Sequence, residues 1–327
     1  MIDGVARGAN RIIYGASDPR VRAIWRISIA IVLSFAGALL GIALLRYVVV
    51  GELFVPVVGH FFAVLGVLSA LVVLARYADD REIPEYGFRL SRRWVLELCL
   101  GTALGIGLVG LAFAVSYWQG SVTVVEVLSA GTTRSFAFGI GVVVLGWIFV
   151  AFWEETLLRS LFFKNAAEGL AARGLTPPVA VFGAWLSSSV IYGFLHGPLG
   201  SNPESVPLLY ALAMTAVMGG LFGIAYALSG ELAVPIGLHL GINVAEHNLF
   251  FGPPEAVTPA VLRVARPGSG GHIQFQSIEP VVIVPVFAFG YLCVIGWVYL
   301  RDGTISHSVR TQGPTSHNDS RKSVTHD

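Results

Sequence analysis

The sequence predicts an all-α fold, a polytopic membrane helix bundle that crosses the bilayer about eight times. Two observations of composition support this: 55% of the 327 residues are hydrophobic, and only 13% are charged. Soluble domains carry about 25% charged residues, so this chain has too few charges to cover a surface in water. A third observation is that the apolar residues fall in runs of about twenty, the length that spans the hydrocarbon core of a bilayer.

Eight apolar runs divide the chain between two polar ends. The first run is too long, and too far from the start, to be a cleaved signal peptide. We expect a cytoplasmic N-terminal segment at 1–24, a transmembrane domain at 25–300 and a flexible cytoplasmic tail at 301–327. The predicted spans lie at 25–47, 57–77, 94–118, 136–158, 178–197, 206–229, 232–250 and 280–300.

The placement of basic residues predicts the orientation of the chain. They gather before the first span, in the second and fourth loops and in the tail. The first, third and fifth loops hold little beyond Arg134, although the seventh carries Arg263 and Arg266. The positive-inside rule then puts both termini in the cytoplasm, in agreement with an even number of spans. Of the 21 basic residues only Lys164 and Lys322 are lysine. Such an arginine bias is typical of GC-rich prokaryotic genomes, and we expect a prokaryotic plasma membrane.

Glycine pairs spaced by four residues recur within the predicted spans. In a membrane such pairs let helix backbones approach closely, so we expect tight helix packing there. The pairs are Gly37 and Gly41, Gly101 and Gly105, Gly219 and Gly223, and Gly237 and Gly241. The two cysteines, Cys99 and Cys293, lie within apolar spans and predict neither a disulfide framework nor a cysteine metal site.

Charged side chains near the end of the fourth span are the first candidates for function. Each charge costs about 2.5–3.5 kcal/mol at the centre of a membrane helix, so its presence needs a reason. Glu155 and Arg159 are one helical turn apart and can form an ion pair. Glu154 points about 100° away around the helix and stays available for another partner. Alternatively, these charges only mark where the helix emerges among lipid headgroups.

His196, at the end of the fifth span, can be that partner. If the fourth helix continues to about Arg173, it forms a hairpin with the fifth span around a turn at 174–178. Glu154 precedes Leu175 by 21 residues, and His196 follows it by 21. Equal counts from the turn give equal depth, because an α-helix rises 1.5 Å per residue. The alternative is an isolated capping or interfacial histidine.

The seventh span carries two polar side chains, His239 and Asn243, in an otherwise apolar run. They are four residues apart, so they share one face of a helix. Polar groups in a bundle interior need partners, which are either hydrogen bonds between helices or a functional site. Residue counting from the turn at 229–230 does not place them level with Glu154, so their depth stays open.

These three motifs together resemble those of a known family. Glu-Glu-x-x-x-Arg, aromatic-x-x-x-His and His-x-x-x-Asn follow one another on successive helices. This order is similar to that of the CAAX prenyl protease and bacteriocin-processing family, also called CPBP or Abi. The resemblance covers about 150–250. Tyr192 stands where the family usually has phenylalanine, and Ala233 where many members have tryptophan.

The resemblance implies an intramembrane endopeptidase that hydrolyses a peptide bond near the membrane. Carried over to this chain, Glu154 and His196 would activate the attacking water. His239 and Asn243 would hold the developing oxyanion. Peptide hydrolysis needs such a general base and such preorganised donors. The expected partners are the lipid bilayer and a peptide or lipidated-protein substrate within it, and no nucleic acid is expected.

Glu155 and Arg159 would orient these catalytic groups. A metal-dependent reading uses the same residues: Glu154, His196 and His239 would be the ligands of a zinc ion with a bound water. We expect no cofactor, because no His-Glu-x-x-His helix is present and asparagine is a poor zinc ligand.

Other classes of intramembrane protease lack support in the sequence. There is no His-Glu-x-x-His, no Gly-x-Ser-x-Gly and no Tyr-Asp or Gly-x-Gly-Asp motif. The remaining alternative is a non-enzymatic membrane protein, a transporter or an immunity protein, that uses the polar cluster as a relay or for structure. That alternative explains buried charges, but it does not explain why three motifs coincide.

Overall fold

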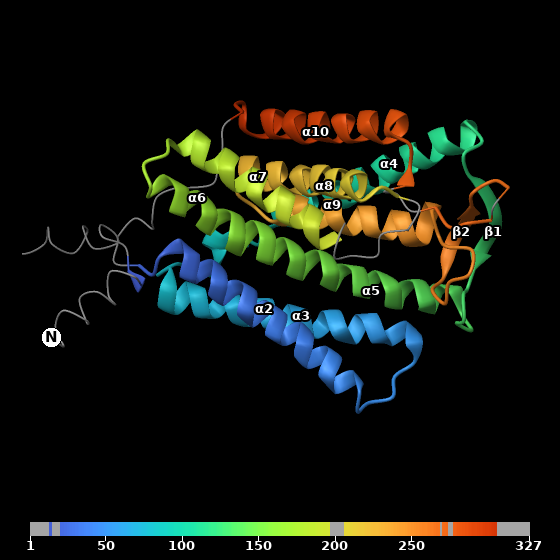
Figure 1. The fold of residues 1–327 in the computed structure, drawn as a ribbon, viewed down its shortest axis with the longest axis horizontal. Helices are drawn as coiled ribbons and strands as arrows, with labels where there is room; N and C mark the ends of the chain where they lie inside the picture. Colours follow the sequence, from blue (N-terminus) through green and yellow to red (C-terminus); the bar gives the residue numbers. More distant parts are fainter. Residues whose placement is uncertain (1–12, 15–19, 197–205, 269, 274–276, 306–327) are drawn as a thin grey trace, which may run out of the picture.

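A computed structural model describes residues 13–14, 20–196, 206–268, 270–273 and 277–305. Most of the two predicted polar ends, 1–24 and 301–327, therefore lies outside the described residues. Helices dominate, and they run side by side as a bundle with a small β-ribbon at one end (Figure 1).

The helices of the described chain follow the predicted spans closely. The α-helices are α2 (Ala23–Leu45), α3 (Val55–Val73), α4 (Arg92–Trp118), α5 (Phe136–Glu155), α6 (Lys164–Ala171), α7 (Pro177–His196), α8 (Leu208–Ser229), α9 (Ala233–Val244) and α10 (Pro280–Asp302). Three π-helical segments continue α3, α5 and α9, at Leu74–Ala78, Thr156–Phe163 and Ala245–Phe250. Short 3-10 helices lie at Glu52–Phe54 and Ile83–Tyr86.

Seven of the described helices are long and apolar enough to cross a membrane, which confirms the polytopic all-α bundle. One of them runs from Phe136 to Ala171 through α5, its π-helical segment and α6. The fourth predicted span therefore continues well past Arg159, as the hairpin with α7 requires.

The eighth predicted span, 232–250, is a helix but is not among the seven. It forms α9 and the π-helical segment that follows, and it contacts α4, α5 and α8. Every residue from 232 to 239 is buried. Because protein surrounds this helix on so many sides, it can carry polar side chains that a lipid-facing helix could not.

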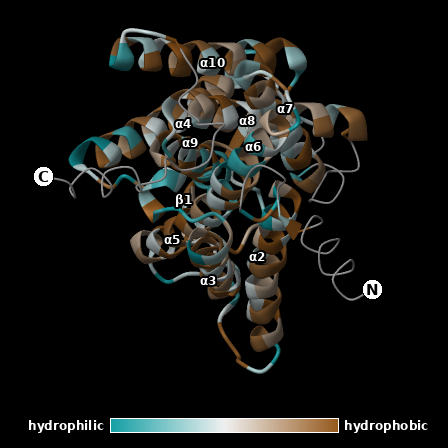
Figure 2. Ribbon diagram, turned by 90° about the vertical axis from the view of Figure 1, so that its left-hand side faces the viewer, coloured by the Kyte–Doolittle hydropathy of each residue, from teal (hydrophilic) through white to brown (hydrophobic). Residues whose placement is uncertain are grey.

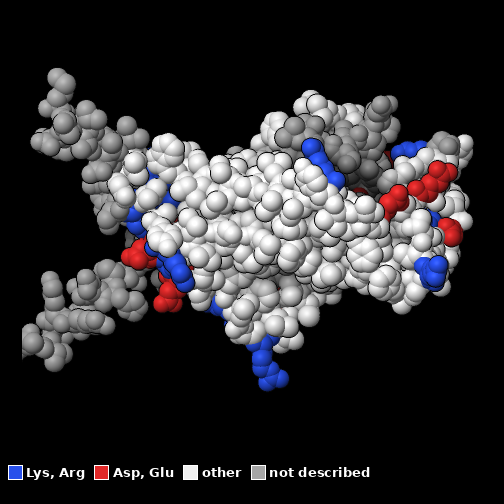
Figure 3. All heavy atoms as spheres, turned by 90° about the horizontal axis from the view of Figure 1, so that it is seen from below, with Lys and Arg blue, Asp and Glu red and all other residues white. Residues whose placement is uncertain are grey.

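The surface of the bundle fits a bilayer. Between 17% and 50% of the most apolar stretch of each spanning helix is buried inside the protein, so the remainder faces outward. Figure 2 shows hydrophobic residues along the helices. Figure 3 shows that most charged side chains of one face lie near the two ends, with a largely uncharged surface between them. In Figure 1, α2 begins and α10 ends at the same end of the bundle.

A two-stranded ribbon lies at the opposite end (Figure 1). β1 (Thr123–Ser129) pairs antiparallel with β2 (Ala260–Ala265), with a bulge after Val124. The sequence predicted only a loop at 251–278. The two strands lie in loops that are far apart in the sequence and come together only when the helices pack. For this reason the sequence did not predict either strand. Buried Arg263 holds the adjoining loop by donating to the backbone carbonyls of Pro253, Ala256 and Thr258.

A buried network of charges ties α2 to α6 at the end where α2 begins. Arg26 forms ion pairs with both Asp79 and Glu168, and Arg81 also pairs with Glu168. The hydroxyl of Tyr86 donates to Asp79. Burial, together with the nearby Asp79 carboxylate, raises the pKa of the Tyr86 phenol, which therefore stays protonated and can donate. The network positions α2 beside the long helix that carries the candidate site.

The glycine pairs allow helix backbones to touch, above all between α4 and α9. A Cβ added to Gly105 would lie 2.5 Å from the carbonyl oxygen of Leu238, and one added to Gly241 would run into the carbonyl oxygen of Thr102. Real side chains do not approach so closely, so only glycine fits at these positions. The predicted close packing is confirmed, and it draws α9 into the interior of the bundle.

Gly241→Ala should lower the free energy of unfolding by about 1–3 kcal/mol, because the added methyl group forces α9 away from α4. The matched control is Gly107→Ala on α4, where a Cβ meets no heavy atom within 4 Å. Thermal unfolding of both variants in detergent measures the difference. If the two variants were equally stable, the close contact between α4 and α9 would be contradicted.

Candidate active site

The candidate site lies where α5 passes into its π-helical segment. Glu154 and Glu155 end α5, and Arg159 follows in the π-helix Thr156–Phe163. Such segments are rare and frequently occur at functional sites, where they distort the regular helix. All three side chains are buried, Glu155 and Arg159 completely. A charge in such a place needs a partner, and each of the three has one.

Glu155 and Arg159 form the predicted ion pair. Arg159 Nε lies 3.0 Å from Glu155 Oε2, and Arg159 Nη1 donates to Ser188 Oγ on α7 at 2.9 Å. The guanidinium also faces the rings of Tyr192 and Phe222, at 5.6 and 6.0 Å from their centroids. Such cation–π contacts add attraction where water is absent. Arg159 thus neutralises the Glu155 carboxylate, and its hydrogen bond to Ser188 links the long helix to α7.

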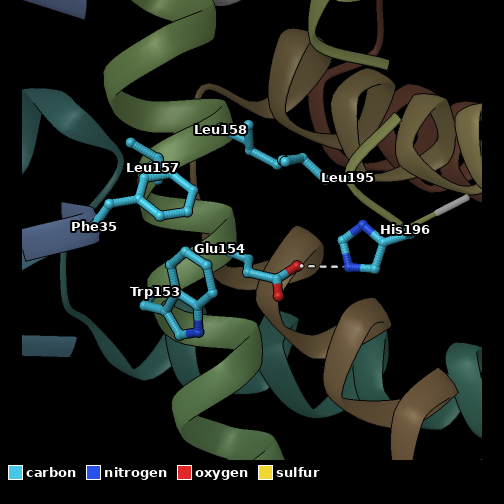
Figure 4. Close-up of a pocket in the computed structure, with 7 residues that line it drawn as sticks. All are labelled: Phe35, Trp153, Glu154, Leu157, Leu158, Leu195 and His196. Atoms are coloured by element: carbon cyan, nitrogen blue, oxygen red, sulfur yellow. Dashed lines mark ion pairs between the residues drawn. The ribbon is translucent and has the colours of Figure 1, made fainter. Parts of the chain in front are cut away.

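Glu154 takes a different partner, His196, at the end of α7. His196 Nε2 lies 3.2 Å from Glu154 Oε2 (Figure 4), which confirms that the two residues lie at the same depth. His196 Nδ1 lies 3.1 Å from the carbonyl oxygen of Tyr192. Since a carbonyl only accepts, this contact places a proton on Nδ1 and directs Nε2 to the carboxylate. The His196 side chain is 30% exposed and that of Glu154 is 11% exposed, so the pair can be reached from outside.

His239 on α9 joins the two carboxylates. Its Nδ1 lies 2.9 Å from Glu155 Oε1, and its Nε2 lies 3.9 Å from Glu154 Oε2. The ring stacks on Phe222 at 5.0 Å with an interplanar angle of 10°. The depth of His239, which residue counting left open, is therefore that of the glutamate pair.

Asn243 lies one turn beyond His239 and joins none of these contacts. Its side chain is half-buried and has no hydrogen-bond partner in the described part of the chain. The structure thus connects five of the six predicted residues directly and places the sixth on the same helix, one turn away. An amide without a protein partner is available to a ligand.

Two residues near this cluster were not among the predicted site residues. His60 on α3 is half-buried and close enough to act electrostatically on Glu154. A single histidine in an apolar span offers no sequence signal, because its neighbour is known only once α3 packs against α5. Tyr192 was noted only as a departure from the family pattern, yet it contacts Arg159 and stacks on His196.

A cavity of about 200 Å³ opens beside the Glu154–His196 pair. Its walls come from α2, from α5 with its π-helical segment and from α7. In Figure 4 the carboxylate and the imidazole face each other across one side of this space, and apolar side chains make up the rest. These apolar residues are Phe35, Trp153, Leu157, Leu158 and Leu195.

Glu154, His196 and His239, the ligands of the zinc alternative, lie close together. Within the described ranges, no group of three or more His, Cys, Asp and Glu side chains has the geometry to hold a metal ion. His239 turns Nδ1 to Glu155, and the Nε2 atoms of His239 and His196 both lie nearest to one oxygen of Glu154.

Residues 136–245 match the family model described as type II CAAX prenyl endopeptidase Rce1-like. This segment is similar to an Rce1-like endopeptidase domain. The resemblance inferred from the three motifs is confirmed over this segment, which is about a third of the chain and contains all six predicted residues. No curated protein and no solved structure matches the chain. The matched segment extends from α5 into the start of the π-helix after α9.

Arg159→Ala should lower the free energy of unfolding by about 3–5 kcal/mol, because it leaves the Glu155 carboxylate buried without its cation. Replacing both Glu155 and Arg159 by Met should recover part of that loss, since no charge is then stranded. Arg173→Ala changes an exposed arginine and should shift stability by less than about 0.5 kcal/mol. Denaturation in detergent compares the variants, and an Arg159→Ala protein as stable as the control would contradict the role of the pair.

Proposed function

We propose that this protein is an intramembrane endopeptidase in which Glu154 and His196 activate the water that attacks a peptide bond. The observation that supports the proposal is the 3.2 Å distance between Glu154 Oε2 and His196 Nε2 at the edge of an apolar cavity. A carboxylate and an imidazole this close can share a proton. Together they can take a proton from water and later give one to the leaving amine.

The reaction proceeds in two steps. Water adds to the substrate carbonyl as its proton passes to the Glu154 carboxylate, and an oxyanion forms. The carbon–nitrogen bond then breaks as the leaving amine receives a proton from the Glu154–His196 pair. A carboxylic acid and a free amine are released, and the catalytic residues return to their initial state.

The oxyanion needs hydrogen-bond donors, and α9 supplies two. Asn243 can donate from its amide. Glu155 accepts from His239 Nδ1, so His239 Nε2 can donate only when the imidazole carries both protons. In other active sites one such donor contributes about 2.7–4 kcal/mol to transition-state stabilisation.

The substrate class follows from the cavity and from the family. The Rce1-like family is described as acting on prenylated CAAX sequences, and we infer a peptide that carries an apolar chain near the scissile bond. Such a chain would lie against the apolar wall while the bond reaches Glu154. Each CH₂ group moved from water into that wall contributes about 0.8 kcal/mol, so a lipidated peptide should bind far better than its unmodified counterpart.

We also propose that the end of the bundle where α2 begins and α10 ends faces the cytoplasm of a prokaryotic cell. Arginines gather at this end, where the positive-inside rule expects them. They include Arg20, Arg22, Arg26, Arg76, Arg81, Arg89, Arg92, Arg93 and Arg301.

Glu154→Gln should lower kcat by about 10²–10⁴-fold, the usual contribution of a general base. The midpoint of thermal unfolding should stay close to that of the parent, because glutamine has the same shape and the Glu155–Arg159 pair is untouched. The probe is a quenched fluorescent peptide with an S-farnesyl cysteine four residues from its C-terminus, compared with the same peptide without the lipid. Glu52→Gln, at an exposed position, is the control. If Glu154→Gln cleaved the peptide at the parent's rate, the role of Glu154 as the general base would be contradicted, and a non-enzymatic role would be favoured.

Cleavage of the same peptide should persist after prolonged chelation, and the purified protein should hold less than one metal ion per chain. The expectation rests on the residues of the site: Asn243 is a poor zinc ligand but a good donor to an oxyanion. Elemental analysis of the purified protein measures the metal content. Stoichiometric zinc, with activity lost on chelation and restored by added zinc, would overturn this mechanism in favour of a metalloprotease.

A further inference from the structure

Tyr192 lies at the centre of the candidate active site although it is not one of the six predicted residues. It sits on α7 one turn before His196, and it is 1% exposed. Its ring stacks on the His196 ring at 4.0 Å and meets the His239 ring nearly edge-on at 6.0 Å. Its ring also faces the guanidinium of Arg159. Tyr192 therefore contacts three of the residues that make up the site.

The packing around Tyr192 fixes the position of its ring. On α8, Gly219 makes room for it, since a Cβ at that position would lie 2.7 Å from the Cβ of Tyr192. Phe222, also on α8, meets the ring edge-on at 5.8 Å. The backbone carbonyl of Tyr192 is held by His196 Nδ1. With its backbone and ring both held, the hydroxyl group has little freedom to move.

No hydrogen bond joins the hydroxyl of Tyr192 to another group in the described part of the chain, and this oxygen is not one of the fully enclosed polar atoms that lack a partner. The charged groups near enough to act on it electrostatically are Glu154, Glu155, Arg159 and Glu246. A hydroxyl that has no protein partner and is not fully enclosed is free to donate to a ligand atom. Phenylalanine would keep the ring contacts but would not supply that donor.

The chemistry of the site creates a need for such a donor. The oxyanion forms close to two carboxylates, and His239 Nε2 can donate to it only when the imidazole is protonated. A phenol is a neutral donor, so it can contribute in every protonation state of His239.

We propose that the Tyr192 hydroxyl is a further catalytic group, which donates a hydrogen bond to the oxyanion formed when water adds to the substrate carbonyl. This rests on the function proposed above. The phenolic proton stays on Tyr192 throughout, and no covalent bond to this residue forms or breaks. The proton of the attacking water goes to Glu154, as before.

Tyr192→Phe tests the proposal, because it removes the hydroxyl and keeps the ring that stacks on His196. With the farnesylated peptide, kcat should fall about 10²–10³-fold, as for the loss of other oxyanion donors, while KM changes by less than about twofold. Tyr299→Phe, at an exposed position on α10, is the matched control. Thermal unfolding should show both variants to be as stable as the parent. A Tyr192→Phe protein with the parent's kcat would overturn the proposal.

A binding measurement separates donation to the oxyanion from mere positioning. The probe is a farnesylated peptide with a phosphinate in place of the scissile bond, which mimics the tetrahedral, negatively charged intermediate. Tyr192→Phe should bind it about 10²-fold more weakly. The uncleaved peptide should bind equally well to Glu154→Gln with and without Tyr192→Phe. Equal weakening for both probes, or no weakening for either, would overturn the proposal.

These outcomes are distinct from a failure of the proposed function. If Glu154→Gln cleaves the peptide at the parent's rate, the proposed mechanism fails whatever Tyr192→Phe does. If Glu154→Gln is inactive and Tyr192→Phe is fully active, only the role of the Tyr192 hydroxyl is wrong.

Discussion

The buried ion pair between Glu155 and Arg159 is the interaction on which the rest of the site depends. Two adjacent carboxylates inside a membrane bundle would repel each other and lose their hydration. Arg159 neutralises one of them, and the other oxygen of Glu155 orients His239. Glu154 is then left to face His196. A carboxylate paired with an arginine and a carboxylate that faces a histidine thus lie side by side on one helix, because their side chains point in different directions.

The second requirement is a helix that can bring polar side chains into the interior. α9 does so because glycines on it and on α4 let the two backbones touch, and because protein rather than lipid covers most of its residues. Its polar residues would be costly at the lipid boundary. Here His239 meets the carboxylates of the long helix. The burial that separates α9 from lipid is therefore also what brings His239 to the site.

The sequence predicted those parts of the site that depend on local geometry. Helical spacing predicted the Glu155–Arg159 pair, and counting along a hairpin predicted the depth of His196, because both depend only on the rise and turn of a helix. The depth of His239 depends on the position of α9 along its axis relative to α4, and this position cannot be obtained by counting residues. His60 needed the packing of α3 on α5, and the β-ribbon needed two loops to meet. No sequence pattern predicted the π-helical segment after Glu155.

One wall of the cavity comes from α2, which lies outside the Rce1-like segment. Phe35 lines the space beside Glu154, while the orientation of α2 is held at its beginning by the charges of Arg26, Asp79 and Glu168. The Glu154–His196 pair and the α2 wall of the cavity thus belong to different parts of the chain. Two proteins with the same motifs from α5 to α9 would accept apolar chains of different length or bulk if their first helices differed. Under the function proposed above, selectivity can therefore change while Glu154 and His196 stay the same.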